Sequence, residues 1–147
     1  MTRALHKLWL KIAALIVAIG GPIFFLGTME PTVEAARLTL DILAWPLDGA
    51  QTAADSDARF LLALSGGFLM GWGVLIWMLS GRVYDAAPEA VRVAVVTGFC
   101  SWFVLDSAGS ILSGHAANAV WNVVVLLSAI GPMWLPAKED RVSPSSP

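Results

Sequence analysis

The sequence predicts an all-α integral membrane protein, a bundle of four transmembrane helices with a short amphipathic helix on its outer side. The first observation behind this prediction is composition: of 147 residues, 57% are hydrophobic and only 14% are charged. The mean hydropathy is +0.72. An average soluble domain carries roughly 25% charged residues, so a soluble globule of this composition would expose much apolar surface to water.

The second observation is that four stretches reach the length of about 20 mostly apolar residues that a membrane-crossing helix needs. They are residues 8–26, 60–79, 91–112 and 116–135. A cleaved signal peptide is the alternative interpretation of the first stretch, because basic residues precede its apolar run. That run is long for a signal peptide, and residues 27–30 offer no small-residue cleavage site, so we expect the stretch to be retained.

The third observation is the placement of the basic residues, which predicts the orientation. With the N-terminus in the cytoplasm, seven Lys and Arg side chains lie on the cytoplasmic side: Arg3, Lys7, Lys11, Arg82, Arg92, Lys138 and Arg141. Only Arg37 and Arg59 lie outside, and these two complete the total of nine. Cytoplasmic loops of membrane proteins are enriched in Lys and Arg. We therefore expect a multi-pass protein of the cell inner membrane with both termini in the cytoplasm.

The connection between the first two stretches, residues 27–59, is the one long loop, and it is acidic. Within it, residues 33–45 place apolar side chains on one helical face and Glu34, Arg37 and Asp41 on the other. This segment is too short and too charged to span a membrane. It predicts an amphipathic helix that lies on the outer surface or caps the bundle.

The remaining connections are short. Residues 80–90 are predicted to join the second and third stretches, and the tight turn at residues 113–115 makes the third and fourth stretches antiparallel neighbours. The helical domain is predicted to cover residues 1–136. Residues 137–147, which end in SPSSP, are predicted to form a disordered cytoplasmic tail.

Glycines predict how the second stretch packs, because helices in lipid associate through close contact at small residues. Gly67 and Gly71 form a small-xxx-small pair, and Gly66 widens that face. One interpretation is contact between helices of the same chain. The alternative is an interface between copies of the chain, so that the glycine face would hold a homo-oligomer together.

Asp106 is the one acidic side chain within the four stretches. A carboxylate inside a span costs roughly 2.5 to 3.5 kcal/mol on insertion scales, so we expect it to face the bundle and to find partners there. Asp106, Asn122 and Ser65 each lie six residues from the outer boundary of their helices, which is about 9 Å deep at the usual rise per residue. Three helices are therefore predicted to bring polar side chains to one level.

Other polar side chains lie above this level. Ser110 is one turn above Asp106, and Asn118 is one turn above Asn122 on the neighbouring helix. Arg59, at the outer end of the second stretch, has a side chain long enough to reach down toward the acid. These residues predict a polar ligand pocket that opens to the outside with Asp106 at its floor. The alternative is a structural clasp in which neighbouring helices satisfy the acid.

Strong signatures of catalysis or of a cofactor are absent from the sequence. It contains no glycine-rich phosphate loop and no HExxH, CxxC or GxSxG motif. His6 precedes the first stretch and His115 lies in an outer turn, so no histidine pair is placed to hold haem. Cys100 is the single cysteine, which excludes an intrachain disulfide and a multi-cysteine metal site. We predict no catalytic residue, metal ligand, cofactor or nucleic-acid partner.

Four segments carry a resemblance to known proteins: LWLKIAALIV at residues 8–17, WPLDGAQ at 45–51, GGFLMGWG at 66–73 and WFVLDSAGS at 102–110. Through them the chain resembles, over nearly its whole length, the small four-span inner-membrane proteins common in proteobacteria. This resemblance brings no activity with it. The DoxX-like four-helix proteins share the size and the number of spans. Their glycine- and arginine-marked first helix is not matched here, and no residues are carried over from them.

The leading functional prediction is a non-catalytic membrane protein, an accessory or ligand-sensing bundle with an outward polar pocket around Asp106. The alternative is a small oligomeric transporter or proton-coupled permease subunit, because four helices alone make a thin wall for a translocation path. A weaker alternative is a membrane enzyme that acts on a lipid or a quinone with Asp106 as its acid or base. The expected partner is the lipid bilayer, and the glycine face of the second stretch offers a homo-oligomer as the alternative considered above.

Overall fold

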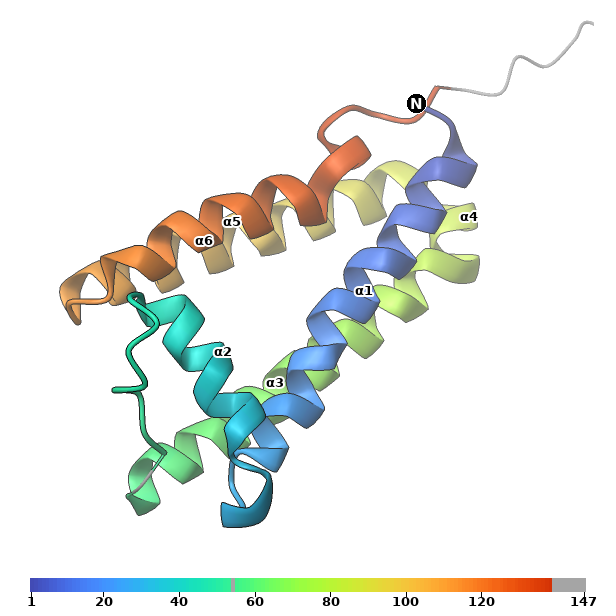
Figure 1. The fold of residues 1–147 in the computed structure, drawn as a ribbon. Helices are drawn as coiled ribbons and strands as arrows, with labels where there is room; N and C mark the ends of the chain where they lie inside the picture. The colour runs from blue at the N-terminus through green and yellow to red at the C-terminus, as the bar shows by residue number, and fades with distance from the viewer. Residues whose placement is uncertain (54, 139–147) are drawn as a thin grey trace, which may run out of the picture.

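The computed structural model describes residues 1–53 and 55–138, and every regular element within them is helical (Figure 1). In chain order these are α1 (Arg3–Leu26), η1 (Glu30–Thr32), α2 (Glu34–Ala44), α3 (Ser56–Met78), the π-helical turn η2 (Leu79–Val83), α4 (Tyr84–Ala86), α5 (Pro88–Leu112), α6 (Ala116–Ile130) and η3 (Gly131–Trp134). Four helical stretches are long and apolar enough to cross a membrane: Arg3–Leu26, Ser56–Ala86, Pro88–Leu112 and Ala116–Trp134. The prediction of an all-α chain with four such stretches is confirmed.

Capping side chains set where the helices begin. The Thr2 hydroxyl accepts a hydrogen bond from the backbone N–H of Leu5 at 3.2 Å, so α1 starts more than a turn before the apolar run. Asp55 caps α3 in the same way, through the N–H of Ala58 at 2.7 Å. Pro88 opens α5 at a position where a helix makes no use of the N–H that proline lacks.

Two segments depart from the boundaries that the sequence predicts. The expected loop at residues 80–90 is instead helical through η2, α4 and the start of α5, apart from a kink at Gly81 and the non-helical Ala87. Tyr84 explains this extension, because it is fully buried in the hydrophobic core and gives the added turns an apolar face to pack. At the other departure, the last span leaves the α-helical path at Gly131, which has φ of 46° and precedes Pro132.

The long helices form two antiparallel pairs, α1 with α3 and α5 with α6. In Figure 1 the pairs meet near the N-terminus and α4 and spread apart away from it, with α2 lying between their far ends. We call the first the junction end, marked by His6, Tyr84 and Met133. The second, marked by α2 and the turn at residues 113–115, we call the open end.

Small residues let α1 and α3 approach closely. A Cβ atom added to Gly66 would lie 2.8 Å from the Gly21 carbonyl oxygen, and one added to Gly73 would lie 2.7 Å from the Ala14 carbonyl oxygen. Both distances are too short for any side chain, so the backbones touch there.

The predicted pair Gly67 and Gly71 lies elsewhere on α3. An added Cβ at either position would meet nothing within 4 Å, and both residues are exposed. Within one chain, the contact between helices is therefore made by Gly66 with Gly73, and not by the small-xxx-small pair. The reason is helical phase: residues seven apart share the face toward α1, whereas Gly67 and Gly71 are turned away from it.

At the junction end, buried polar side chains accompany the hydrophobic core. The Tyr84 hydroxyl lies 2.8 Å from Nδ1 of His6, and both side chains are fully buried. Nε2 of His6 is buried without a hydrogen-bond partner among the described residues. Trp9 donates its indole N–H to the carbonyl of Ser128 at 2.9 Å, which links α1 to α6 and so joins the two pairs.

At the open end, α2 bridges α1 and α6. Ala36 is fully buried against the end of α1, and Trp121 of α6 donates its indole N–H to the carbonyl of Ile42 at 3.0 Å. Asp41 is buried too, because both of its carboxylate oxygens accept the N–H of Gly49 at 3.1 Å and fold the following loop back onto the helix. Of the two placements that the sequence allows for this segment, the structure has the capping one.

The two ends of the described chain lie together at the junction end. The N–H of Lys138 donates to the carbonyl of Met1 at 2.8 Å. The predicted tail covers residues 137–147, of which 139–147 lie outside the described residues.

Candidate ligand pocket

A cavity of about 710 Å³ lies between the two helix pairs. All of the long helices and α2 contribute to it. Its lining residues are Phe24, Leu43, Ser65, Phe68, Leu69, Trp72, Gly98, Trp102, Asp106, Asn118, Asn122 and Val125. Most of these residues are apolar or aromatic, and three of the polar ones, Asp106, Asn118 and Asn122, are joined by hydrogen bonds.

Asp106 accepts two hydrogen bonds on the same carboxylate oxygen. Its Oδ2 lies 2.9 Å from Nδ2 of Asn118 and 2.6 Å from Nδ2 of Asn122. The two asparagines are one turn apart on α6, and the short turn at residues 113–115 brings α6 back along α5, so both amides reach the acid. An ionised carboxylate only accepts hydrogen bonds, which fixes the amide nitrogens toward it.

Two serines of α5 accept further hydrogen bonds from the asparagine amides. The amide of Asn118 also donates to Oγ of Ser110 at 2.8 Å, and the amide of Asn122 donates to Oγ of Ser107 at 3.1 Å. Asn122 is 3% exposed and Ser107 is 8% exposed, so this half of the cluster is removed from solvent. The network fixes the orientation of both amides and therefore the position of the carboxylate.

The cluster still has unused acceptors. No hydrogen bond reaches Oδ1 of Asp106 from residues 1–53 or 55–138, and the carbonyl oxygens of Asn118 and Asn122 face away from the acid. Asp106 itself is only half-buried. The polar end of the cavity therefore presents oxygen acceptors, one of them a carboxylate oxygen, and the amide donors of Asn118 and Asn122 already have acceptors.

Aromatic rings form the wall next to this polar end. Trp72 of α3 packs against Phe99 of α5 with 4.7 Å between the ring centroids, and its centroid is 6.2 Å from that of Trp102. Trp102 lies one helical turn before Asp106 and one turn after Gly98, so all three share the cavity face of α5. A Cβ atom added to Gly98 would meet nothing within 4 Å.

The structure brings together most of the residues that the sequence proposes for the pocket. Ser65 lines the cavity on α3, opposite Asp106, with Asn118 and Asn122. Ser110 stands behind Asn118 and is not among the lining residues.

Arg59 is placed differently from the expectation. Its guanidinium forms an ion pair with Glu30 and donates to the carbonyl of Ala53 at 3.0 Å, so it is held in the connection between α1 and α3 and does not approach Asp106. An acid of the same loop lies nearer than the acid of α5, and the two charges pair locally.

Several residues of the site could not be predicted from the depth of each residue below the outer end of its helix. Ser107 lies beside Asp106 in sequence, and only its hydrogen bond to Asn122 gives it a role. Trp72 and Trp102 lie far from the ends of their spans, where tryptophan is usually enriched. Their depth is a signal in the sequence, but the pairing of the two rings depends on how α3 faces α5.

Within residues 1–53 and 55–138, no group of three or more His, Cys, Asp or Glu side chains is placed to hold a metal ion. The chain was also compared with known proteins. No protein-family model, curated protein or solved structure matches it.

Proposed function

We propose that this protein is a non-catalytic membrane protein that binds a small ligand in the cavity between its two helix pairs. The observation that carries this proposal is the cavity of about 710 Å³ with a fixed carboxylate at one end. Small-molecule sites are typically concave and mostly apolar, with a few placed polar groups, and have volumes of about 300 to 1,000 Å³. The lining of this cavity has that composition.

Binding explains features that a structural clasp leaves unexplained. The hydrogen bonds of Asp106 link α5 to α6, two helices that already pack along their length. The hydrogen bond from Asn122 is one part of the structural clasp considered above, but its other parts, a hydrogen bond from Ser65 of α3 or an ion pair with Arg59, do not form among the described residues. Instead the pairs diverge and the second carboxylate oxygen stays unused. A ligand between the pairs would supply the missing partner.

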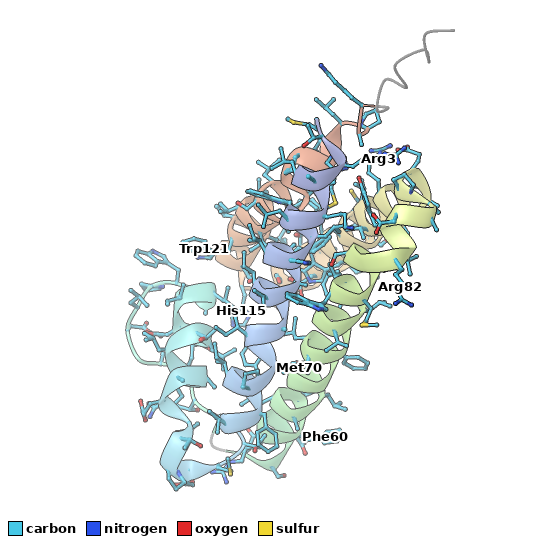
Figure 2. The ribbon with its side chains drawn as sticks, turned by 90° about the vertical axis from the view of Figure 1, so that its right-hand side faces the viewer. Arg3, Phe60, Met70, Arg82, His115 and Trp121 are labelled. Carbon is cyan, nitrogen blue, oxygen red and sulfur yellow. The ribbon has the colours of Figure 1, made fainter. Side chains whose placement is uncertain are left out.

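We further propose that the protein lies in the cell inner membrane with both termini in the cytoplasm. The basic residues support this orientation: in Figure 2, Arg3 and Arg82 lie toward the junction end and Phe60 toward the opposite end. The junction end would then be cytoplasmic, as the enrichment of Lys and Arg in cytoplasmic loops requires. A C-terminal green fluorescent protein fusion should fluoresce, and a C-terminal alkaline phosphatase fusion should be inactive. The reverse pattern would overturn the orientation.

Cysteine labelling tests the pocket. In a Cys100→Ser background, Gly98→Cys places a thiol in the cavity, and Gly67→Cys places one on the outward face of α3. Both glycines are helical and have open space around them, so the two variants are matched. A small charged methanethiosulfonate reagent added to intact cells should modify Gly98→Cys and leave Gly67→Cys unmodified, since a thiol in lipid does not ionise. Equal protection of both thiols would contradict a solvated pocket.

A small oligomeric transporter is the second candidate, favoured by the unoccupied glycine face at Gly67 and Gly71. Copies of the chain would pack against each other at this face, so that several chains together would surround a translocation path. Native mass spectrometry should then show an oligomer that Gly67→Leu converts to a monomer. A monomer in the unsubstituted protein would remove this candidate and leave the binding proposal in place.

A further inference from the structure

We propose that the ligand is a hydrophobic organic cation, such as a lipophilic amine or a quaternary onium ion. This inference rests on the proposed binding function and assigns the ligand class. Four properties of the cavity carry it: the charge of its lining, the direction of its hydrogen bonds, its aromatic wall and its volume.

The charge of the lining selects a cation. Among the twelve lining residues Asp106 is the one ionisable side chain, and there is no Lys, Arg or His. The arginines of α2 and of the start of α3 are engaged elsewhere, Arg37 with Glu34 at 2.8 Å and Arg59 with Glu30. An anionic ligand would add a second negative charge beside the carboxylate, whereas a cation would neutralise it.

The direction of the hydrogen bonds selects the same class. The amide N–H groups of Asn118 and Asn122 are directed at Asp106, which leaves their carbonyl oxygens and Oδ1 of the acid as acceptors. A protonated amine would satisfy them with N–H donors, and an onium ion without N–H groups would meet them through its positive charge alone. A carboxylate or phosphate ligand would bring further acceptors and find no free donor on the amides that hold Asp106; the other donors in the lining are the Ser65 hydroxyl and the indole N–H groups of Trp72 and Trp102.

The aromatic wall and the volume make the cation an organic one. The rings of Phe24, Phe68, Trp72 and Trp102 line the cavity. A cation within about 6 Å of an aromatic ring centroid is attracted to its face, most strongly by tryptophan. A bare metal ion would require six or more oxygen ligands in the case of calcium, and a single carboxylate beside apolar walls does not offer them. A cavity of about 710 Å³ instead fits a cation that carries apolar groups.

Two probes of one shape and opposite charge test the inference: tetraphenylphosphonium and tetraphenylborate, with triphenylphosphine oxide as a neutral relative. Isothermal titration calorimetry on the purified full chain in lipid nanodiscs should show saturable phosphonium binding. The same nanodiscs without protein correct for partition into lipid. We expect the borate to bind at least about tenfold more weakly, and Asp106→Asn to weaken the phosphonium at least about tenfold while changing the affinity for the neutral probe little.

A second variant keeps the test decisive if Asp106→Asn fails to fold. Trp102→Leu removes an aromatic face and retains the carboxylate, so it should weaken the phosphonium more than the neutral probe, whereas Trp102→Phe should restore part of the loss. Equal affinities for all three probes, unchanged in the folded variants, would overturn the cation inference and leave the pocket standing. Binding of none of the probes would count against the pocket itself, and the proposed function would fail with it.

Discussion

Asn122 is the side chain that combines burial with the shortest contact to Asp106. Its amide nitrogen lies 2.6 Å from the carboxylate and 3.1 Å from Ser107, and the residue is 3% exposed. Asn118 makes a longer bond of 2.9 Å from a half-buried position. The two asparagines bind the same oxygen, but only the loss of Asn122 would leave the buried Ser107 hydroxyl without its partner.

Replacing Asn122 should therefore destabilise the protein more than replacing Asn118. We expect Asn122→Ala to lower the free energy of unfolding by about 1 to 3 kcal/mol, because it leaves buried polar groups unpaired. Asn118→Ala should cost less, since water can reach its position. Unfolding of the purified protein in detergent, followed by tryptophan fluorescence, measures both. Equal costs for the two variants would show that burial of the cluster does not matter.

At the scale of the helices, the span positions follow from the sequence and the packing faces do not. Apolar runs predict the four spans, and apolar and charged residues on opposite helical faces predict α2. The extension through α4 escapes prediction because Arg82 and Asp85 make that segment read as a loop. In the structure Asp85 instead pairs with Lys7 at 2.8 Å, and Tyr84 turns inward. Which face of α3 meets α1 depends on helical phase and on the partner, information that no single helix contains.

The glycines of α3 give the clearest test at this scale. Gly66→Val would drive a side chain into the Gly21 carbonyl, 2.8 Å from the added Cβ, and should lower the free energy of unfolding by about 1 to 3 kcal/mol. Gly67→Val, with nothing within 4 Å, should change it by no more than about 0.5 kcal/mol. The same unfolding measurement distinguishes them. A large effect at Gly67 in a monomeric sample would contradict the observed packing of α1 on α3.

At the scale of the molecule, the depth calculation succeeds for residues on neighbouring helices and fails where loops intervene. Asp106, Asn118 and Asn122 meet because a tight turn joins α5 to α6 and fixes their register. Arg59 lies at the end of the long acidic loop, whose path the sequence leaves open, and it pairs with Glu30 there. The cavity also depends on the divergence of the two pairs, which follows from contacts at the junction end and not from any one span.

The junction end should accordingly be sensitive to a change that removes one atom. In Tyr84→Phe the buried Nδ1 of His6 loses its hydroxyl partner, while Nε2 already has none among the described residues. We expect a loss of about 1 to 3 kcal/mol in the free energy of unfolding. The control is Lys7→Gln, which breaks the partly exposed ion pair with Asp85 and should cost about 0 to 1 kcal/mol. Similar losses for both variants would mean that the buried hydrogen bond between Tyr84 and His6 stabilises the fold no more than a partly exposed ion pair does.

The backbone hydrogen bond between Lys138 and Met1 makes the fold close to cyclic. A peptide of a few residues could connect these two positions, and new ends could be opened at the exposed turn of residues 113–115 without cutting a helix. Such a circularly permuted protein would begin with α6 and end with α5. The new ends would then lie at the open end of the fold, away from the original ones.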